Sequence, residues 1–435
     1  MNKKQWTSLL ISIVLIFSFS PLKAEVTAPN IAAESAILID ADTKTVLYEK
    51  NGYDQHYPAS ITKLMTALLA IENLSPNDVL TFSQEAIFGI ERGSSHIGID
   101  VGEQLTVDQA LHGLLLMSAN EVANGLAEAV SGSIDAFAER MTERAQSLGA
   151  LNTHFANPHG LHDPNHYTTA YDMALIGSYL AQNDYFLQIM KDANCQIPPT
   201  NLTNEVRYLS QQHKMLNPLR DATIYREDVI GGKTGYTDQA RHTLVTMAKQ
   251  GDTTLVAVIL QSEKDTLYTD TAKLLDYGFD SYHSLTLYTS NDILKTLPIY
   301  NVKSGQVYQS ANCGVGLTEA ISIIVPQTVS KEDITLSFNL SEWLDDTVQV
   351  GDTVGEVSFI SNSKLIQKSP LVIKQMTPLP TPDFSFASIS TSSSLSNSMK
   401  LAVLVLILLV LLIMVVFIRK HHRRKKYYKI NKLFK

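Results

Sequence analysis

The stretch YPASITKLMTALLA, residues 57–70, combines the pattern of a buried helix with two polar residues at its start. Ser60 and Lys63 are three residues apart, so on a helix the hydroxyl and the amine lie on the same face and can meet. One interpretation is a helix cap followed by a solvated lysine. The other is a nucleophile beside its base. The apolar residues that predict the helix are Leu64, Met65, Leu68 and Leu69.

The position of this pair in the chain makes it more informative than its spacing. A Ser with a Lys three residues later also occurs at Ser20/Lys23 and at Ser361/Lys364, so the spacing alone is weak evidence. Ser60 instead follows a proline at a predicted helix N-terminus, where free N–H groups and the helix dipole stabilise negative charge. A lysine that is partly removed from water there can be neutral and act as a base.

Two further triplets could complete such a site. Ser118-Ala119-Asn120 lies between two predicted apolar helices, and Lys233-Thr234-Gly235 lies in the strand-like segment VIGGKTGY. Similar triplets, Ser310-Ala311-Asn312 and Lys303-Ser304-Gly305, occur in reversed order in a region rich in predicted strands. We interpret that second pair as turns.

Both ends of the chain carry targeting patterns. Residues 1–24 begin with Lys3 and Lys4, continue with an apolar run and end in an alanine, which predicts a secretory signal peptide; a retained anchor is the alternative. Residues 401–418 are uncharged and nearly all Leu, Val and Ile, which predicts one transmembrane helix rather than a core helix. The basic tail 419–435 is then cytoplasmic, and the catalytic region lies outside a cell membrane that the chain crosses once.

Charge and cysteine content exclude several classes of protein. Residues 25–398 carry 22 Lys and Arg against 43 Asp and Glu, a net charge of −21. Such a surface is a poor match for nucleic acid or anionic lipid. Cys195 and Cys313 are the only cysteines, so pairing between them stays open. No Cys/His spacing typical of a metal site occurs, and we expect no metal and no cofactor.

Element patterns predict a catalytic domain over residues 25–284 with an α+β, two-layer α/β body. Strands come from both ends of this domain and helices from its middle. The predicted strands are 36–49, as a pair, and 229–260, with a hairpin at Gly251-Asp252. The predicted helices are 107–117, 120–130, 133–148, 171–181 and a closing helix at 273–282.

The rest of the exterior region has two different compositions. Residues 285–376 alternate polar and apolar residues between turns, which predicts a small all-β, sandwich-like domain. Residues 377–398 are rich in Pro, Ser and Thr and nearly uncharged, which predicts a stalk leading to the membrane.

Taken in order, the three polar motifs resemble those of the penicillin-binding proteins and serine β-lactamases, with Ala119 where that pattern has Asp. The flanking sequences GSSHIGIDVGEQLTVDQALHGLLLMSANEVANGLAE and HGLHDPNHYTTAYDMALIG resemble the D-alanyl-D-alanine carboxypeptidases, which are low-molecular-mass penicillin-binding proteins. The close resemblance covers about residues 33–284. It implies a penicillin-binding, β-lactamase-like transpeptidase fold, followed by the small all-β domain, the stalk and the transmembrane helix.

The resemblance also implies a role for each motif residue. Ser60 would attack the carbonyl between two D-alanines of a peptidoglycan pentapeptide stem, and Lys63 would take its proton. Ser118 would transfer protons. The residues implied to bind the substrate are Asn120, Lys233, Thr234, Gly235 and Tyr236, and the N–H groups of Ser60 and Tyr236 would form an oxyanion hole. β-Lactam antibiotics would acylate Ser60 as inhibitors.

Several alternatives remain open at this stage. An endopeptidase or transpeptidase could use the same site, as could a β-lactamase, although residues 157–172 contain no Glu that could activate a deacylating water. A tethered wall-binding module without turnover is the non-enzymatic alternative. His159, His162 and His166 share one loop, and solvation is the simpler interpretation of each. Arg241 and Lys214 are candidates for a second contact to the substrate carboxylate.

Overall fold

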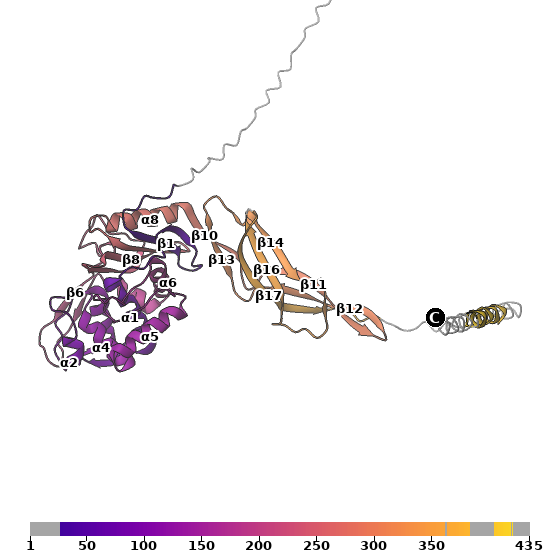
Figure 1. Ribbon diagram of the computed structural model, residues 1–435, viewed down its shortest axis with the longest axis horizontal. Helices are drawn as coiled ribbons and strands as arrows, with labels where there is room; N and C mark the ends of the chain where they lie inside the picture. The colour runs from indigo at the N-terminus through magenta and orange to yellow at the C-terminus, as the bar shows by residue number, and fades with distance from the viewer. Residues whose placement is uncertain (1–26, 362, 383–403, 419, 421–435) are drawn as a thin grey trace, which may run out of the picture. The chain divides into compact units, whose positions relative to one another are not determined.

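The computed structural model describes residues 27–361, 363–382, 404–418 and 420 (Figure 1). Two compact units can be distinguished. The first comprises residues 1–297, 313–342 and 349–376, and the second comprises residues 298–312, 343–348 and 377–435. The predicted signal peptide and most of the predicted stalk and tail lie outside the described residues.

A five-stranded antiparallel sheet organises the first part of the chain, with the order β2-β1-β9-β8-β7. The predicted N-terminal strand pair is confirmed, and so is the hairpin at Gly251-Asp252. Strand β7 is an edge strand of this sheet and lies beside the turn that carries Ser60. Its strands are β1 (Ser35–Asp40), β2 (Val46–Lys50), β7 (Val229–Thr237), β8 (Arg241–Gln250) and β9 (Thr253–Ser262).

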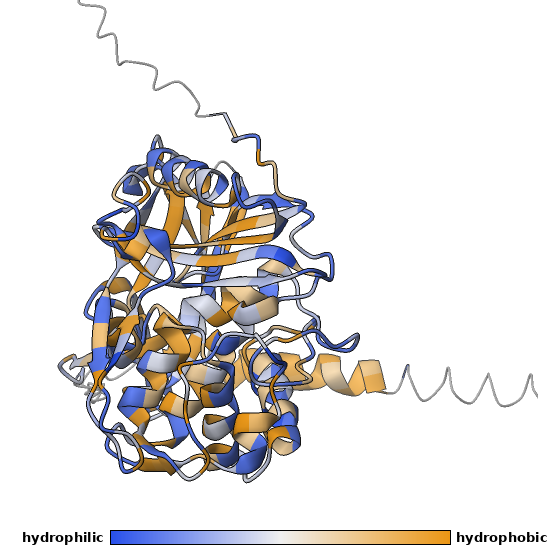
Figure 2. Cartoon of the chain, turned by 90° about the vertical axis from the view of Figure 1, so that its left-hand side faces the viewer, coloured by the Kyte–Doolittle hydropathy of each residue, from blue (hydrophilic) through white to orange (hydrophobic). Residues whose placement is uncertain are grey.

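Both faces of this sheet are buried, because successive side chains of a strand point to opposite faces. Ile37 and Ile39 belong to one apolar core, whereas Ala36 and Leu38 belong to another on the opposite face. Figure 2 shows the apolar colour concentrated on these strands and on the helices packed against them. Burial on both faces makes the sheet a rigid support for whatever its edge carries.

Helices cover one face of the sheet and form the larger core (Figure 1). Gly177 of α6 lies against β8 and β9, where an added Cβ would be 2.9 Å from Val256 Cγ1. The predicted helices 107–117, 120–130, 133–148 and 171–181 correspond closely to α3, α4, α5 and α6 of the helices on this face. The helices on this face of the sheet are α1 (Lys63–Asn73), α2 (Gln84–Phe88), α3 (Val107–Leu116), α4 (Asn120–Ser131), α5 (Ile134–Ser147), α6 (Ala170–Leu180) and α7 (Asp184–Met190).

The opposite face is closed by α8 (Leu267–Ser281), which begins before the predicted start at residue 273. No element was predicted for residues 261–272. Asp270 is in fact buried, because its carboxylate accepts hydrogen bonds from the N–H groups of Ala32 and Ala33 at 2.7 and 3.1 Å. With α8 in place the sheet is sandwiched between helical layers, one more layer than the sequence predicted.

Short elements border the larger core. Two antiparallel strand pairs, β3 (Val79–Thr81) with β4 (Gln104–Thr106) and β5 (Asn194–Ile197) with β6 (Arg207–Ser210), lie outside the main sheet. The 3-10 turn η2 (Lys214–Leu216) follows β6, and η1 (Ala59–Thr62) precedes α1. Thr106 begins α3 with a capping box that it forms with Gln109.

Residues 282–378 form strands with one short 3-10 turn, η3 (Lys331–Asp333), as the alternating pattern predicted. Turns fall at 304–305 and 350–351, as expected. Residues 310–312, however, lie within a strand rather than in a turn. The strands are β10 (Tyr282–Tyr288), β11 (Ile293–Lys303), β12 (Gln306–Gly316), β13 (Ile321–Pro326), β14 (Ile334–Leu340), β15 (Leu344–Asp345), β16 (Thr353–Ser361) and β17 (Lys364–Pro378).

Pairing within the first unit joins β10 to β13, and β16 to both β14 and β17, all antiparallel. A separate apolar core of this region includes Leu287, Ile323, Val357 and Phe359. Cys195 and Cys313 are both free thiols. Residues 404–418 are helical, but within the described part of the chain no helix reaches the length and apolar character that crossing a bilayer requires.

Candidate active site

Ser60 lies in the 3-10 turn η1, immediately before α1, so α1 begins at Lys63, slightly later than the start predicted near Ser60. The turn is held in an unusual backbone conformation, since Ala59 has φ +52°. Two segments distant in sequence fix it. Gly160 (φ +85°) packs directly on the Ala59 carbonyl, where no side chain would fit, and Thr243 Oγ1 donates a 2.8 Å hydrogen bond to the Pro58 carbonyl.

Lys63 is fully buried and its amine contacts three oxygens. Its Nζ lies 3.1 Å from Ser60 Oγ and donates to Asn120 Oδ1 at 2.7 Å and to the His159 carbonyl at 2.6 Å. Burial lowers the pKa of Lys63 well below its ordinary value, and the positive charge of Lys233 lowers it further. The lowered pKa favours the neutral form of this amine, which stands beside the Ser60 hydroxyl.

The second motif places its two polar side chains differently. Asn120 is the first residue of α4 and contacts Lys63, while its N–H donates to the Ser95 carbonyl at 2.9 Å. Ser118 has φ +62°, and its buried Oγ has no hydrogen-bond partner among the described residues. Ala119, at the N-cap of α4, provides no side-chain cap. The Ser118 hydroxyl is thus free to bond to a substrate.

The third motif lies on the edge strand β7. Lys233 is 2% exposed and its Nζ donates to the Thr234 carbonyl at 2.8 Å. Burial lowers the pKa of Lys233 to about 7. Gly235 approaches η1 so closely that a Cβ there would lie 2.8 Å from the Ser60 nitrogen. Only glycine allows this strand to pack against the turn that carries Ser60.

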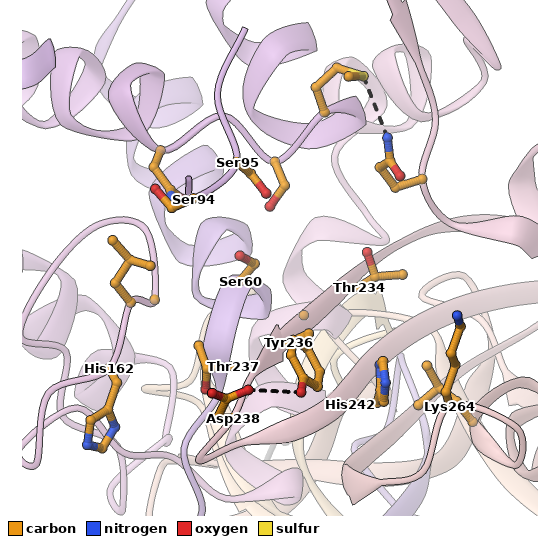
Figure 3. A pocket seen from close by; sticks show the side chains of 18 of the residues that line it. Ser60, Ser94, Ser95, His162, Thr234, Tyr236, Thr237, Asp238, His242 and Lys264 are labelled. Atoms are coloured by element: carbon orange, nitrogen blue, oxygen red, sulfur yellow. Dashed lines mark hydrogen bonds between the residues drawn. The ribbon is translucent and has the colours of Figure 1, made fainter. Parts of the chain in front are cut away.

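A cleft of about 1320 Å³ connects these motifs. Ser60, Ser118, Asn120 and Thr234 line it, whereas the buried Lys63 and Lys233 lie behind its surface. Figure 3 shows Ser60 between Ser94 and Ser95 on one side and the β7 residues on the other. The Tyr236 side chain is exposed at the cleft and its hydroxyl donates to Asp238 at 3.0 Å (Figure 3).

The three loop histidines do not form a base for Ser60. His166 is buried with Nε2 2.8 Å from Thr62 Oγ1, and burial lowers its pKa to about 3. His162 lines the cleft and contacts the Tyr57 ring edge-on at 4.7 Å. His159 contributes its backbone carbonyl to Lys63, a role that no side-chain motif in the sequence could indicate.

The two candidates for a second carboxylate contact are already paired. Lys214 lines the cleft, but its amine lies 3.0 Å from Asp221. Arg241 forms an ion pair with Glu263, and Arg241 is not among the residues that line the cleft. Neither side chain contacts Ser60 or the β7 motif through a described hydrogen bond.

Glu121 is a residue near the site that the sequence analysis missed. It follows Asn120 in α4, is 2% exposed, and accepts a 2.7 Å hydrogen bond from the Ile97 N–H through Oε1. Burial raises the pKa of Glu121. Its charge in turn raises the pKa of Lys63. The signal in the sequence was a carboxylate within an otherwise apolar helical segment directly after a polar motif.

Superposition on solved structures shows which class of protein has this fold. The fold is that of a penicillin-binding protein with a C-terminal all-β domain. Penicillin-binding protein 5 from Haemophilus influenzae superimposes with a TM-score of 0.69 and 25% identity, over 81% of this chain and 99% of that one. A D-alanyl-D-alanine carboxypeptidase structure from Mycobacterium tuberculosis gives a TM-score of 0.53 at 31% identity, over 59% of this chain and 94% of that one.

The sequence comparison then identifies the family. Residues 23–264 match the D-alanyl-D-alanine carboxypeptidase family of peptidases, and residues 282–378 match the C-terminal domain of penicillin-binding protein 5. The carboxypeptidase DacF of Bacillus subtilis is 29% identical over 79% of this chain and 85% of its own length. The chain belongs to this family, and it is a serine-type D-alanyl-D-alanine carboxypeptidase.

Proposed function

We propose that the chain removes the terminal D-alanine of peptidoglycan pentapeptide stems through an acyl-enzyme on Ser60. The observation that carries this proposal is the buried amine of Lys63, 3.1 Å from Ser60 Oγ. A serine hydroxyl is a weak nucleophile at neutral pH and needs an adjacent base. The rings of His159 and His166 bond to other groups, and no described hydrogen bond joins His162 to Ser60, whereas the Lys63 amine lies within hydrogen-bond distance of Ser60 Oγ.

The partners of Lys63 support its role as the base. The Asn120 amide oxygen and the His159 carbonyl can only accept, so they bind the two N–H groups of a neutral amine. The nitrogen lone pair then points to Ser60 and accepts the hydroxyl proton as Oγ attacks. Ser118, whose Oγ has no hydrogen-bond partner in the described part of the chain, would transfer that proton to the nitrogen of the departing D-alanine.

Substrate binding would use the edge of β7. The stem peptide would lie beside β7 as an added strand, since Gly235 leaves no side chain between the strand and Ser60. Its terminal carboxylate would bind Thr234 near the positive charge of Lys233, and its amide would contact Asn120. The N–H groups of Ser60 and Tyr236 would stabilise the oxyanion of the tetrahedral intermediate.

Water would then hydrolyse the acyl-enzyme, whereas a β-lactam would acylate Ser60 and leave slowly. A fast β-lactamase is disfavoured by the segment 157–172. Its Asp172 is buried and accepts hydrogen bonds from the Asn152 N–H at 2.8 Å and from Thr153 Oγ1 at 2.7 Å, so it serves the structure. No carboxylate of that segment lines the cleft within the described residues.

We also propose that the enzyme acts on the outer side of a cell membrane. Residues 1–24 would direct secretion, residues 25–284 and 285–376 would form the exterior domains, and 377–398 would be a stalk to a single span at 401–418. The basic tail 419–435 would stay in the cytoplasm. A chain shortened before Leu401 should then leave the membrane fraction and keep its activity.

The test is release of D-alanine from a defined pentapeptide stem by the wild-type chain and by Ser60→Ala. The proposal predicts stoichiometric release by the wild type and none above background by the variant. Dimeric cross-linked stems report endopeptidase activity in the same assay, and penicillin consumption reports β-lactamase activity. Release that persists in Ser60→Ala would assign the nucleophile to another residue.

A further inference from the structure

The tip of the β11–β12 hairpin, together with Trp343 just before β15, carries an apolar patch that the carboxypeptidase chemistry does not use. Val302 and Val307 are 63% and 70% exposed, and Trp343 is 57% exposed. These residues and Tyr300, which we call the hairpin patch, all belong to the second unit. The catalytic cleft lies in the first unit, so the patch is a separate feature.

Backbone geometry places the four side chains on one face. Ser304 and Gly305 both have positive φ, +53° and +78°, which makes a two-residue hairpin turn of the type that matches strand twist. This turn sets Val302 opposite Val307, and Tyr300 lies on the same face two residues earlier. The Trp343 ring meets Tyr300 edge-on, with centroids 6.2 Å apart.

The face of the hairpin that carries Tyr300, Val302 and Val307 should be polar if only water contacts it. The opposite face of β11 carries the buried Leu297 and Ile299, so the strand already has its core side. A strand buried on one face normally alternates to polar residues on the other. Exposed valines at a hairpin tip beside a tryptophan and a tyrosine therefore indicate a surface that is covered by something apolar.

The continuation of the chain identifies what covers it. The Leu379 N–H donates a 2.8 Å hydrogen bond to the Ser310 carbonyl of β12, so the chain leaves the folded region from the strand that carries Val307. It then reaches the uncharged segment 401–418 and a basic tail. The intervening residues 380–400 span at most about 75 Å when fully extended, so the end of β17 stays within that distance of any membrane that holds that segment.

We propose that the hairpin patch rests in the interfacial layer of the lipid bilayer that anchors the chain, an inference that depends on the proposed membrane attachment. Tryptophan and tyrosine favour that layer, where an aromatic ring is apolar while its polar atom stays hydrated. A weak contact suffices, because tethering raises the effective concentration of the patch at the surface. Glu342, Asp345 and Asp346 flank it, so anionic lipid is not required.

Tryptophan fluorescence can test this directly. The chain has two tryptophans, Trp6 in the predicted signal peptide and Trp343 in the patch, so Trp6→Phe leaves Trp343 as the single emitter. The full chain is reconstituted in phosphatidylcholine vesicles with or without lipids brominated near the top of the acyl chain. The inference predicts a blue-shifted emission and at least about twofold quenching by the brominated lipid.

A matched pair of variants shows whether the patch is responsible. Val302→Asn with Val307→Asn should abolish most of the quenching, while Val79→Asn with Leu219→Asn should leave it unchanged. Val79 and Leu219 are also exposed apolar residues, at 61% and 82%, and they lie outside the hairpin patch. Penicillin labelling of every variant confirms that the catalytic region is folded and active.

Vesicle flotation separates this inference from the attachment on which it rests. A chain that floats with the vesicles but shows unquenched Trp343 emission would overturn the inference and leave the attachment standing. A chain that does not float would overturn both. A blue shift that grows with protein concentration, without quenching by brominated lipid, would show that the patch binds a second copy of the chain instead of lipid. A blue shift that occurs only when peptidoglycan is added would show that the patch binds glycan instead of lipid.

Discussion

Replacing Gly235 by alanine should impair acylation far more than folding. The new methyl group would collide with Thr243 Oγ1 and would lie 2.8 Å from the Ser60 nitrogen and 3.1 Å from the Ile61 nitrogen. Non-bonded heavy atoms prefer separations of about 3.5–4.0 Å. The strand and the turn must therefore separate by roughly 0.5–1 Å, which moves Ser60 relative to the oxyanion-hole donors.

The size of the effect follows from that displacement. A misplacement of about 1 Å in a catalytic site costs on the order of 100-fold in rate. This corresponds to about 2.7 kcal/mol of transition-state stabilisation. Overpacking by one methyl group costs about 1–3 kcal/mol of folding stability. The variant should thus remain folded while its second-order rate of acylation falls about 100-fold.

The assay is time-resolved labelling with a fluorescent penicillin, read beside thermal unfolding. Gly231→Ala on the same strand is the control, because its methyl group would meet Phe186 and Met247 at 3.0 and 3.3 Å in the apolar core rather than Ser60. It should lose stability but keep near-normal acylation. Wild-type rates in Gly235→Ala, or equal rate losses in the two variants, would refute the argument.

Three further predictions concern the polar groups of the site. Ser118→Ala should change the free energy of unfolding, measured by calorimetry, by less than about 0.5 kcal/mol, because Ser118 Oγ has no partner among the residues that the structure describes. The same variant should lower turnover, measured by D-alanine release, by about 100-fold or more. Lys233 loses its charge as pH rises through about 7, so the KM for a stem with a free carboxylate should increase above that pH. Lys233→Arg should flatten this profile. Glu121→Gln keeps an oxygen that accepts the hydrogen bond from the Ile97 N–H, but it removes a negative charge that raises the pKa of Lys63. The acid limb of the pH profile of the acylation rate should therefore move to lower pH. An acid limb that does not move would contradict this coupling between Glu121 and Lys63.

Much of the site was predictable because its side chains occur in short local motifs. Ser60 and Lys63 share one helical turn, and Ser118 and Asn120 flank the start of a helix, so each pair is fixed by local structure. Their meeting across the fold was implied only by family resemblance. The structure provides the physical cause, which is that Asn120 bonds to Lys63 and that Gly235 allows β7 to approach η1.

Other contributions could not be predicted from residue types. The His159 carbonyl contacts Lys63 through the backbone, and any residue in that position has such a carbonyl. The buried role of Asp270 depends on N–H groups more than 200 positions away, which is why the start of α8 was placed too late. Lys214 and Arg241 were plausible as isolated cations, but their pairing with Asp221 and Glu263 is a tertiary feature.

The most direct test of the catalytic assignment is mass spectrometric mapping of the residue that penicillin acylates. The chain is incubated with excess benzylpenicillin, digested, and searched for the added mass on each peptide. The account predicts one adduct, on Ser60, that is absent from Ser60→Ala and forms far more slowly in Lys63→Ala. An adduct on Ser118 or another residue, or labelling of Ser60 that does not depend on Lys63, would contradict it.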